Sequence, residues 1–254
     1  MADANTDGGA GVLRRLRVAA RSRVRRHRRL YGLVRLLKYG PYRGFTDDRA
    51  RRALLERAER EGWRVLYLGS GGRRQPGMVN LDITWETGPD VVGDGFRLPF
   101  AEGTFDAIFC EAVIEHVADP ERFLALASRV LKPGGVWYLE APLLQPWHGG
   151  SDFQRWTLEG FRDALRRAGL VPLGAGIHMG PGFGLMWIVR EWLALLLSGG
   201  FGPVRAVLRW GLGFALSPLL LLDPVLMALP ASAELACANW HIARRPPAGD
   251  GEAP

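Results

Sequence analysis

A short apolar strand that runs into a glycine turn constrains this chain most. Residues 64–72 read Arg-Val-Leu-Tyr-Leu-Gly-Ser-Gly-Gly, and residues 79–82 read Val-Asn-Leu-Asp. The four apolar residues before the first glycine suit a strand buried in a parallel sheet. Gly69 and Gly71 have no Cβ, so the backbone can approach a ligand closely there. Asp82 ends the second strand, and its carboxylate is expected to accept hydrogen bonds from a ribose at the carboxyl edge of an α/β sheet.

Four further segments follow in a fixed order. They are Val-Gly-Asp-Gly-Phe-Arg-Leu-Pro-Phe at 92–100, Gly-Thr-Phe-Asp-Ala-Ile-Phe-Cys at 103–110, Ala-Val-Ile-Glu-His-Val at 112–117 and Leu-Lys-Pro-Gly-Gly-Val-Trp-Tyr at 131–138. Together with the glycine turn they resemble the class I S-adenosylmethionine (SAM) methyltransferases over about residues 64–170. The resemblance implies a doubly wound, seven-stranded Rossmann-like α/β sheet with one antiparallel strand near its end. It also implies that SAM is the cofactor and that the protein is a SAM-dependent methyltransferase.

The resemblance further implies which residues bind the cofactor. The expected contacts are Gly69, Ser70 and Gly71 with the methionine part, Asp82 with the ribose and Ile83 beside it, Asp94 and Gly95 with the adenine, and Cys110 and Glu111 along the floor. Tyr67 stands where the family has an acid, and Arg73 stands where it has a third glycine. Pro76-Gly77 lies between the two strands, so a loop is expected in place of the first helix.

Two groups of residues are candidates for catalysis. Glu115-His116 follows the fourth expected strand and resembles a pair in quinone-precursor O-methyltransferases, but Ala112 replaces their additional acid, so no metal is assigned. The second group is His148, Asp152 and Arg155, after the fifth expected strand. We expect His148 to act as a base near neutral pH, and Asp152 and Arg155 either to pair with each other or to bind the substrate. A purely local structural role remains open for both groups.

The positive charge of the chain is concentrated near its start. Residues 12–43 carry eleven Arg, one Lys and no acid, and removing these twelve charges from the net +7 leaves −5. Apolar residues recur at spacings of three and four from Leu13 to Leu37, which predicts a basic amphipathic helix. Such a helix suits an anionic membrane surface. The alternatives are a helix that packs on the domain and, less favoured because of the apolar stripe, one that binds RNA.

A long apolar segment precedes the last expected strand. Residues 180–235 are rich in leucine and contain three tryptophans, but Pro218 and Pro224 interrupt the most apolar window. We expect two or three helices that form an apolar cap or a membrane-surface patch, with a membrane-spanning hairpin as the alternative. The predicted organisation is a basic arm over 1–45, a SAM-binding core over 46–179, the insertion over 180–235, and a last strand with a tail over 236–254.

These features lead to one main functional hypothesis and two alternatives. The main hypothesis is methyl transfer to a membrane-proximal small-molecule, lipid-linked or glycan acceptor. The alternatives are an RNA methyltransferase that uses the arginine arm and a non-catalytic SAM-binding protein at a membrane. Two cysteines give no disulfide framework, which favours a reduced compartment. The expected location is therefore cytoplasmic, at the inner face of a membrane, and the oligomeric state is left open.

Overall fold

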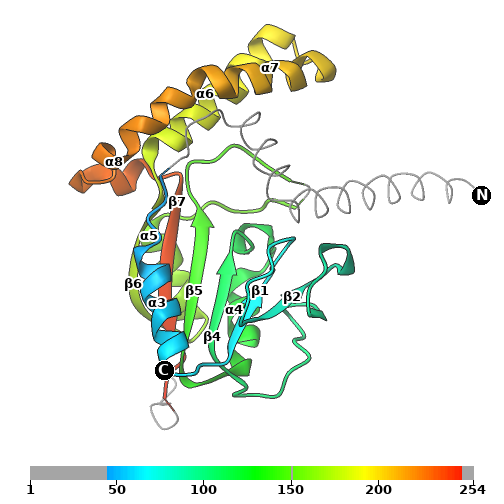
Figure 1. Cartoon of the computed structure of the whole chain (residues 1–254), viewed down its shortest axis with the longest axis vertical. Helices are drawn as coiled ribbons and strands as arrows, with labels where there is room; N and C mark the ends of the chain where they lie inside the picture. The colour runs from blue at the N-terminus through cyan, green and yellow to red at the C-terminus, as the bar shows by residue number, and fades with distance from the viewer. Residues whose placement is uncertain (1–44, 150, 248–254) are drawn as a thin grey trace, which may run out of the picture.

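The fold is built on one seven-stranded sheet (Figure 1). The computed structural model describes residues 45–149 and 151–247. The strands are β1 (Val65–Leu68), β2 (Val79–Asp82), β3 (Val91–Val92), β4 (Phe105–Glu111), β5 (Leu131–Pro142), β6 (Val171–Met179) and β7 (Ala238–Arg244). Their order is β3-β2-β1-β4-β5-β7-β6, in which β7 runs antiparallel to both β5 and β6. The predicted sheet, with its antiparallel strand near one end, is confirmed.

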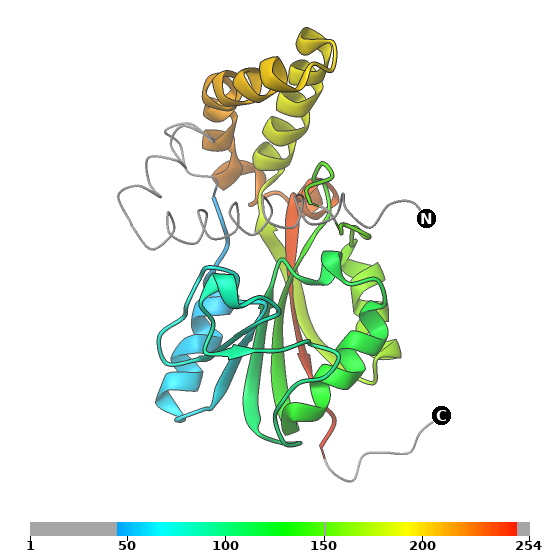
Figure 2. The same cartoon turned by 90° about the vertical axis from the view of Figure 1, so that its right-hand side faces the viewer.

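Helices cover both faces of this sheet, as Figure 2 shows. Alternating side chains of the buried strands supply the two faces. Leu66 and Ile108 pack in the cluster beneath α4 (Pro120–Ala127) and α5 (Leu158–Arg167). Tyr67 and Phe109 pack on the other face, against α3 (Arg49–Arg60). Both faces are therefore buried, which explains why β1 is apolar throughout.

Local signals set the helix ends. The Thr157 hydroxyl accepts a hydrogen bond from the Gly160 amide at 3.0 Å and caps the start of α5. Helix α4 ends at Ala127, and a 3₁₀ turn, η3 (Ser128–Val130), follows it. Residues 132–134 lie near the start of β5. Backbone hydrogen bonds of Gly134 and Gly135 with Arg245 hold that start of the strand in place.

The segment between β1 and β2 contains turns and no helix, as the proline and glycine there predicted. The amides of Gly69 and Ser70 both donate to the carbonyl of Leu81, at 2.9 and 3.0 Å. These bonds fold the glycine turn back onto the end of β2. The turn and Asp82 are thereby brought side by side.

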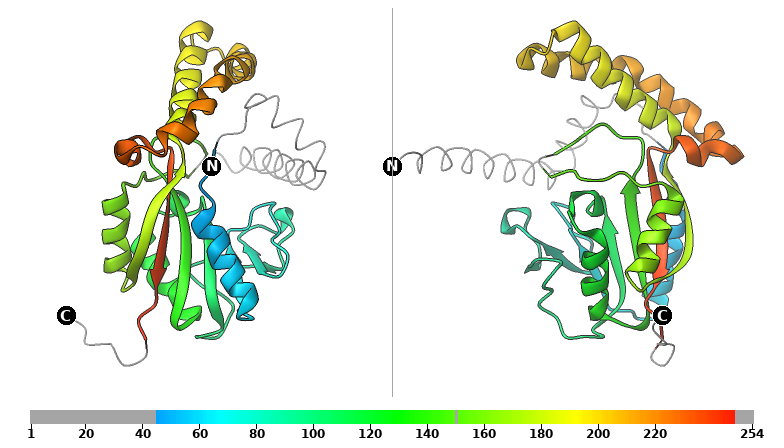
Figure 3. Two further views of the ribbon diagram at one scale, coloured as in Figure 1. Left: turned by 60° about the vertical axis from the view of Figure 1, so that its left-hand side comes forward. Right: turned by 180° about the vertical axis from the view of Figure 1, so that it is seen from behind.

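The insertion is helical, as predicted. It comprises α6 (Pro181–Ser198), α7 (Gly202–Leu216), η4 (Ser217–Leu222), α8 (Asp223–Leu226) and η5 (Pro230–Leu235). Helices α6 and α7 form a hairpin that projects beyond the carboxyl ends of the parallel strands (Figures 1 and 3). Residues 1–44, which include the predicted basic helix, lie outside the described residues. The basic helix and the domain boundaries therefore stay predictions.

The insertion begins on a buried carboxylate. Asp223 is fully buried and accepts hydrogen bonds from the amides of Gly182, at 2.6 Å, and Phe183, at 3.2 Å. These amides lie in the first turn of α6, where a helix has unpaired N–H groups and favours negative charge. A Cβ on Gly182 would lie 2.7 Å from the Leu219 carbonyl oxygen. Through these two hydrogen bonds, Asp223 ties the start of α8 to the start of α6 at the base of the hairpin.

Candidate active site

A pocket of about 440 Å³ opens at the carboxyl edge of the sheet. It is lined by Leu68, Gly69, Leu81, Asp82, Ile83, Gly93, Asp94, Gly95, Phe96, Ala112, Val113, His116, Val117, Ala118, Phe123 and Phe153. Five of the nine predicted cofactor contacts, namely Gly69, Asp82, Ile83, Asp94 and Gly95, are among these residues. One predicted catalytic residue, His116, is also there.

The glycine turn forms one wall of the pocket. Gly69 has φ +72°, which favours glycine, and a Cβ there would collide with Val113. Ser70 and Gly71 of the same turn are not part of the lining. The Ser70 hydroxyl is buried and has no hydrogen-bond partner among the described residues. Buried polar groups usually have a hydrogen-bond partner, so this hydroxyl is, within the described part of the chain, an unpaired group beside the glycine turn.

Asp82 organises the turn as well as facing the pocket. One carboxylate oxygen accepts the Gly71 amide at 2.6 Å, and the other accepts the Thr84 amide at 3.1 Å and its hydroxyl at 3.2 Å. A carboxylate can accept about four hydrogen bonds. Asp82 therefore still has capacity for a ligand hydroxyl while it holds the turn.

Aromatic rings line the part of the pocket near Asp94 and Gly95. Asp94 accepts the Phe96 amide at 2.9 Å, which closes a tight turn around Gly95. The Phe96 ring packs edge-on against Phe123 at 5.5 Å, and a Cβ on Gly95 would collide with Phe123. The glycine is thus required by the close approach of this ring. A planar base would find aromatic and aliphatic surface here.

Cys110 and Glu111 do not line the pocket, contrary to the expectation. Cys110 points into the core beneath α4 and α5, where burial raises the pKa of its thiol. Glu111 points to the opposite face and pairs with Arg51 of α3 at 2.5 Å. Its other oxygen accepts the Tyr67 hydroxyl at 2.9 Å. The two side chains point to opposite faces because neighbouring residues of β4 alternate across the sheet.

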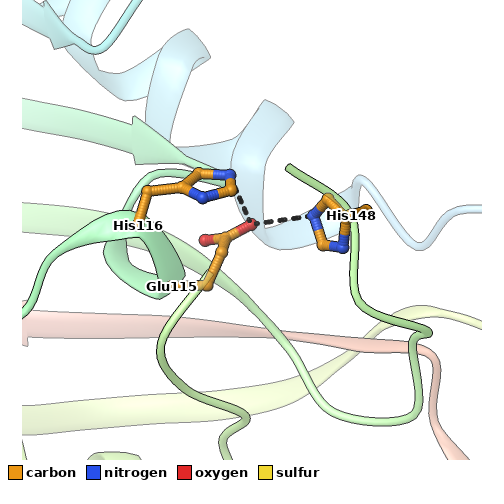
Figure 4. Close-up of side chains that lie close together, drawn as sticks. All are labelled: Glu115, His116 and His148. Carbon is orange, nitrogen blue, oxygen red and sulfur yellow. Dashed lines mark ion pairs between the residues drawn. The ribbon is translucent and has the colours of Figure 1, made fainter. Parts of the chain in front are cut away.

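Glu115, His116 and His148 lie close together, as Figure 4 shows, and His116 is part of the pocket lining. A Glu115 carboxylate oxygen lies 3.9 Å from Nε2 of His116 and 3.7 Å from Nε2 of His148. Glu115 is 1% exposed, and its second oxygen has no hydrogen-bond partner among the described residues. The carboxylate raises the pKa of His148 above its ordinary value, although burial opposes this. An ionisable cluster therefore adjoins an apolar pocket.

The loop that carries His148 is held by Asp152 and Arg155. Both carboxylate oxygens of Asp152 pair with the Arg155 guanidinium, and one also accepts the His148 amide at 2.8 Å. Arg155 donates further to the carbonyls of Gln145 and Pro146, both at 3.1 Å. The guanidinium holds the pKa of Asp152 well below its usual range. The fully buried Asp152 side chain positions His148 rather than facing the pocket.

Two features of the cluster were not assigned from the sequence. Glu115 was read only as part of a Glu-His pair, whereas its carboxylate also meets His148 from a separate loop. The His148 ring also packs on Trp187 of α6 at 5.5 Å, so the insertion contacts the site. No spacing rule connects residues of η2 (Ile114–His116), this loop and α6, because only the folded sheet brings them together.

Comparisons with known proteins agree with this architecture. Residues 74–139 match the family model described as a methyltransferase domain. A ubiquinone biosynthesis O-methyltransferase of Caulobacter vibrioides is 41% identical over 61 residues, which cover 21% of this chain and 23% of that protein. A demethylmenaquinone methyltransferase of Parafrankia sp. is 48% identical over 44 residues, or 17% of each. The matches thus span less than a quarter of these relatives.

Solved structures with a similar fold include the cyclase SpnF, with a TM-score of 0.49 and 19% identity over 86% of this chain and 93% of that one. Another is phosphoethanolamine N-methyltransferase 2 of Haemonchus contortus, solved with SAM, with a TM-score of 0.46 and 17% identity over 84% of this chain and 52% of that one. At these values they carry no information about activity.

Proposed function

Because the core of this chain is a class I SAM-dependent methyltransferase domain, we propose that the protein transfers a methyl group from SAM to a small, lipid-linked acceptor at a membrane surface. The observation that carries the proposal is the joining of two kinds of residues in one pocket. Gly69 and Asp82 lie at one part of its wall, and His116, with its ionisable partners, lies at another. The residues proposed to bind the cofactor and those proposed to act on the acceptor would thus lie next to each other in one pocket.

The described residues fit the cofactor. The volume of about 440 Å³ is within the range of small-molecule sites. Asp82 would hold the ribose, the surface of Phe96 and Ile83 would contact the base, and the Gly69 turn and the unpaired Ser70 hydroxyl would lie toward the methionine part. When bound, SAM supplies an electrophilic methyl group on a sulfonium sulfur.

The acceptor would lie on the side of His116 and His148. Asp152 and Arg155 fix the loop that presents His148, so the ring would keep its orientation when an acceptor enters. Alignment of the acceptor atom with the methyl group is the main requirement of such a transfer. The mostly apolar lining, including Val117 and Phe153, would keep water out of the reaction.

The α6–α7 hairpin supports the membrane part of the proposal. Positions 192–204 contain no charged residue. The exposed apolar side chains around this tip include Trp192, Leu195, Leu196, Leu197, Phe201 and Val204. Exposed apolar side chains gathered on an uncharged segment are typical of an interaction site. The ion pairs of Glu191 with Arg205 and Arg209 lie just outside the tip, so charge is kept away from it.

One described stretch, Gly202–Leu226, is helical, long and apolar enough to cross a bilayer, with a mean hydropathy of 1.4. It changes from α7 to the 3₁₀ turn η4 at Ser217, and it ends with the buried Asp223 that anchors α6. Shallow insertion of the hairpin tip suits this geometry better than a single span. The predicted basic arm would add attraction to anionic lipid.

The experiment measures SAM binding to the full chain by calorimetry and then the release of S-adenosylhomocysteine with separated cell fractions. Binding followed by methylation in the lipid fraction is the expected result. Transfer to RNA would favour the arginine-arm alternative, and binding without transfer to any fraction would favour a non-catalytic role. Absence of SAM binding would overturn the proposal.

A further inference from the structure

We propose that Glu115, His116 and His148 form a site for one divalent transition-metal ion of the zinc class, with an open position for an oxygen of the acceptor. The sequence had suggested no metal, because the additional acid of the quinone-precursor enzymes is absent at Ala112. In the folded chain a histidine from another loop takes the place of that acid.

Two of the three pairs of ligand atoms are already close to the spacing that an ion needs. One atom from each residue lies within 4.8 Å of the others, and the two Glu115–histidine separations are 3.7 and 3.9 Å. Zinc bonds of about 2.1 Å in a tetrahedron place neighbouring ligand atoms about 3.4 Å apart. A contraction of a few tenths of an ångström therefore suffices for these two pairs.

Hydrogen bonds orient both rings for ligation. Nδ1 of His116 contacts the Ser151 carbonyl oxygen, and Nδ1 of His148 contacts the Pro146 carbonyl oxygen at 3.1 Å. A carbonyl oxygen only accepts, so each Nδ1 carries a proton and, in the neutral ring, each Nε2 keeps a lone pair for a metal ion. Both Nε2 atoms face Glu115 (Figure 4). Outer contacts of this kind accompany metal-binding histidines.

The carboxylate supplies the independent observation. Glu115 is 1% exposed, and one of its oxygens has no hydrogen-bond partner among the described residues. A buried carboxylate in this condition is costly unless a cation or a donor compensates it. Its backbone is also fixed, because its carbonyl accepts the Phe153 amide at 2.8 Å. A bound ion would compensate this charge.

Two histidines and one carboxylate leave a fourth position open, as in catalytic rather than structural zinc sites. His116 lines the pocket, so this position is adjacent to the acceptor side. An oxygen acceptor would bind there, and the ion would lower the pKa of its hydroxyl. This consequence rests on the proposed function, but metal binding does not. Under this assignment His148 is a ligand instead of the base expected from the sequence.

The test loads the metal-free full chain with Co²⁺ and Zn²⁺ in the absence of SAM. We expect one Zn²⁺ per chain after dialysis and Co²⁺ absorption bands of a four- or five-coordinate site. Glu115→Gln, His116→Phe and His148→Phe should each weaken Zn²⁺ binding at least tenfold. The matched control is His178→Gln, since His178 also faces two acids, Asp48 and Glu140, outside the cluster.

Zn²⁺ retained equally by wild type and by all three folded variants would overturn the proposal, as would wild type that retains none. If a variant fails to fold, the modification of wild-type His116 and His148 by diethylpyrocarbonate is measured instead. Zn²⁺ should protect both histidines, and equal modification with and without the ion would overturn the assignment. Loss of SAM binding in protein that still binds Zn²⁺ would contradict only the proposed function.

Discussion

At the scale of single residues, Asp82 links the glycine turn to the pocket. Its two oxygens already accept three hydrogen bonds from Gly71 and Thr84. Asp82→Asn replaces one acceptor oxygen by an NH₂ donor. This donor would face a backbone N–H group or a ligand hydroxyl, so a hydrogen bond that the carboxylate accepts would be lost. Loss of a hydrogen bond to a charged group costs about 1.5–3 kcal/mol, so calorimetry should show SAM binding weakened by roughly 10- to 150-fold. Glu102→Gln, in an exposed pair with Arg129, should leave affinity unchanged. Unchanged affinity in folded Asp82→Asn would remove Asp82 from the cofactor site.

Single residues were predictable where the reason is local. Gly69 and Asp82 follow from a strand end and a turn, and both line the pocket. Cys110 and Glu111 were expected beside them but are not in the described lining, because the resemblance gives a position along β4 but not the face of the sheet. The contact of His148 with Glu115 depends on a loop that folds back over η2, and no pattern in the sequence encodes that distance.

At the scale of elements, the base of the hairpin depends on close packing at Gly182. A Cβ there would lie 2.7 Å from the Leu219 carbonyl oxygen and 2.8 Å from an Asp223 carboxylate oxygen. Gly182→Ala should therefore lower the free energy of unfolding by about 1–3 kcal/mol, as overpacking does. Gly211 of α7 is the matched control, since nothing lies within 4 Å of its added Cβ. Gly211→Ala should stabilise by about 0.5–1 kcal/mol in urea unfolding. Equal effects of both changes would contradict this account of the hairpin base.

Most elements were predictable because caps, glycines and apolar periods mark them. The insertion shows the limit. Asp223 lies within the apolar window that Pro218 and Pro224 interrupt, and nothing in the sequence indicates that it caps α6 from a distant segment. Composition indicated helices, but their pairing as a hairpin that reaches beyond the sheet depends on tertiary contacts.

At the scale of the whole molecule, His241 makes stability depend on pH. The ring lies in β7 against Phe161 at 4.5 Å, and burial lowers its pKa from 6.5 to about 3. Between these values the unfolded chain binds the proton and the folded chain does not, so stability falls as pH falls below 6.5. The loss approaches about 1.4 kcal/mol per pH unit, or about 2 kcal/mol between pH 7 and pH 5. His241→Leu should lose less stability than wild type over this interval in urea unfolding, whatever its stability at pH 7. Parallel pH profiles of the two proteins would show that His241 does not carry the effect.

The position of the hairpin also predicts how the molecule meets a membrane. Leu196 and Leu197 are 61% and 60% exposed at the uncharged tip, while Leu173 on β6 is 53% exposed outside the hairpin. Each leucine buried in the lipid interface would contribute roughly 1.5–3 kcal/mol at most. Leu196→Ser together with Leu197→Ser should therefore reduce co-sedimentation of the full chain with anionic vesicles at least tenfold, and Leu173→Ser should not. SAM affinity should stay the same in all three proteins, because the tip lies away from the pocket lining. High salt should weaken wild-type binding only in part, since it screens the basic arm but leaves the apolar contact. The opposite outcome is vesicle binding that is lost at high salt and is unchanged by the leucine substitutions. It would show that the basic arm alone attaches the protein to the membrane and that the hairpin tip contacts another partner.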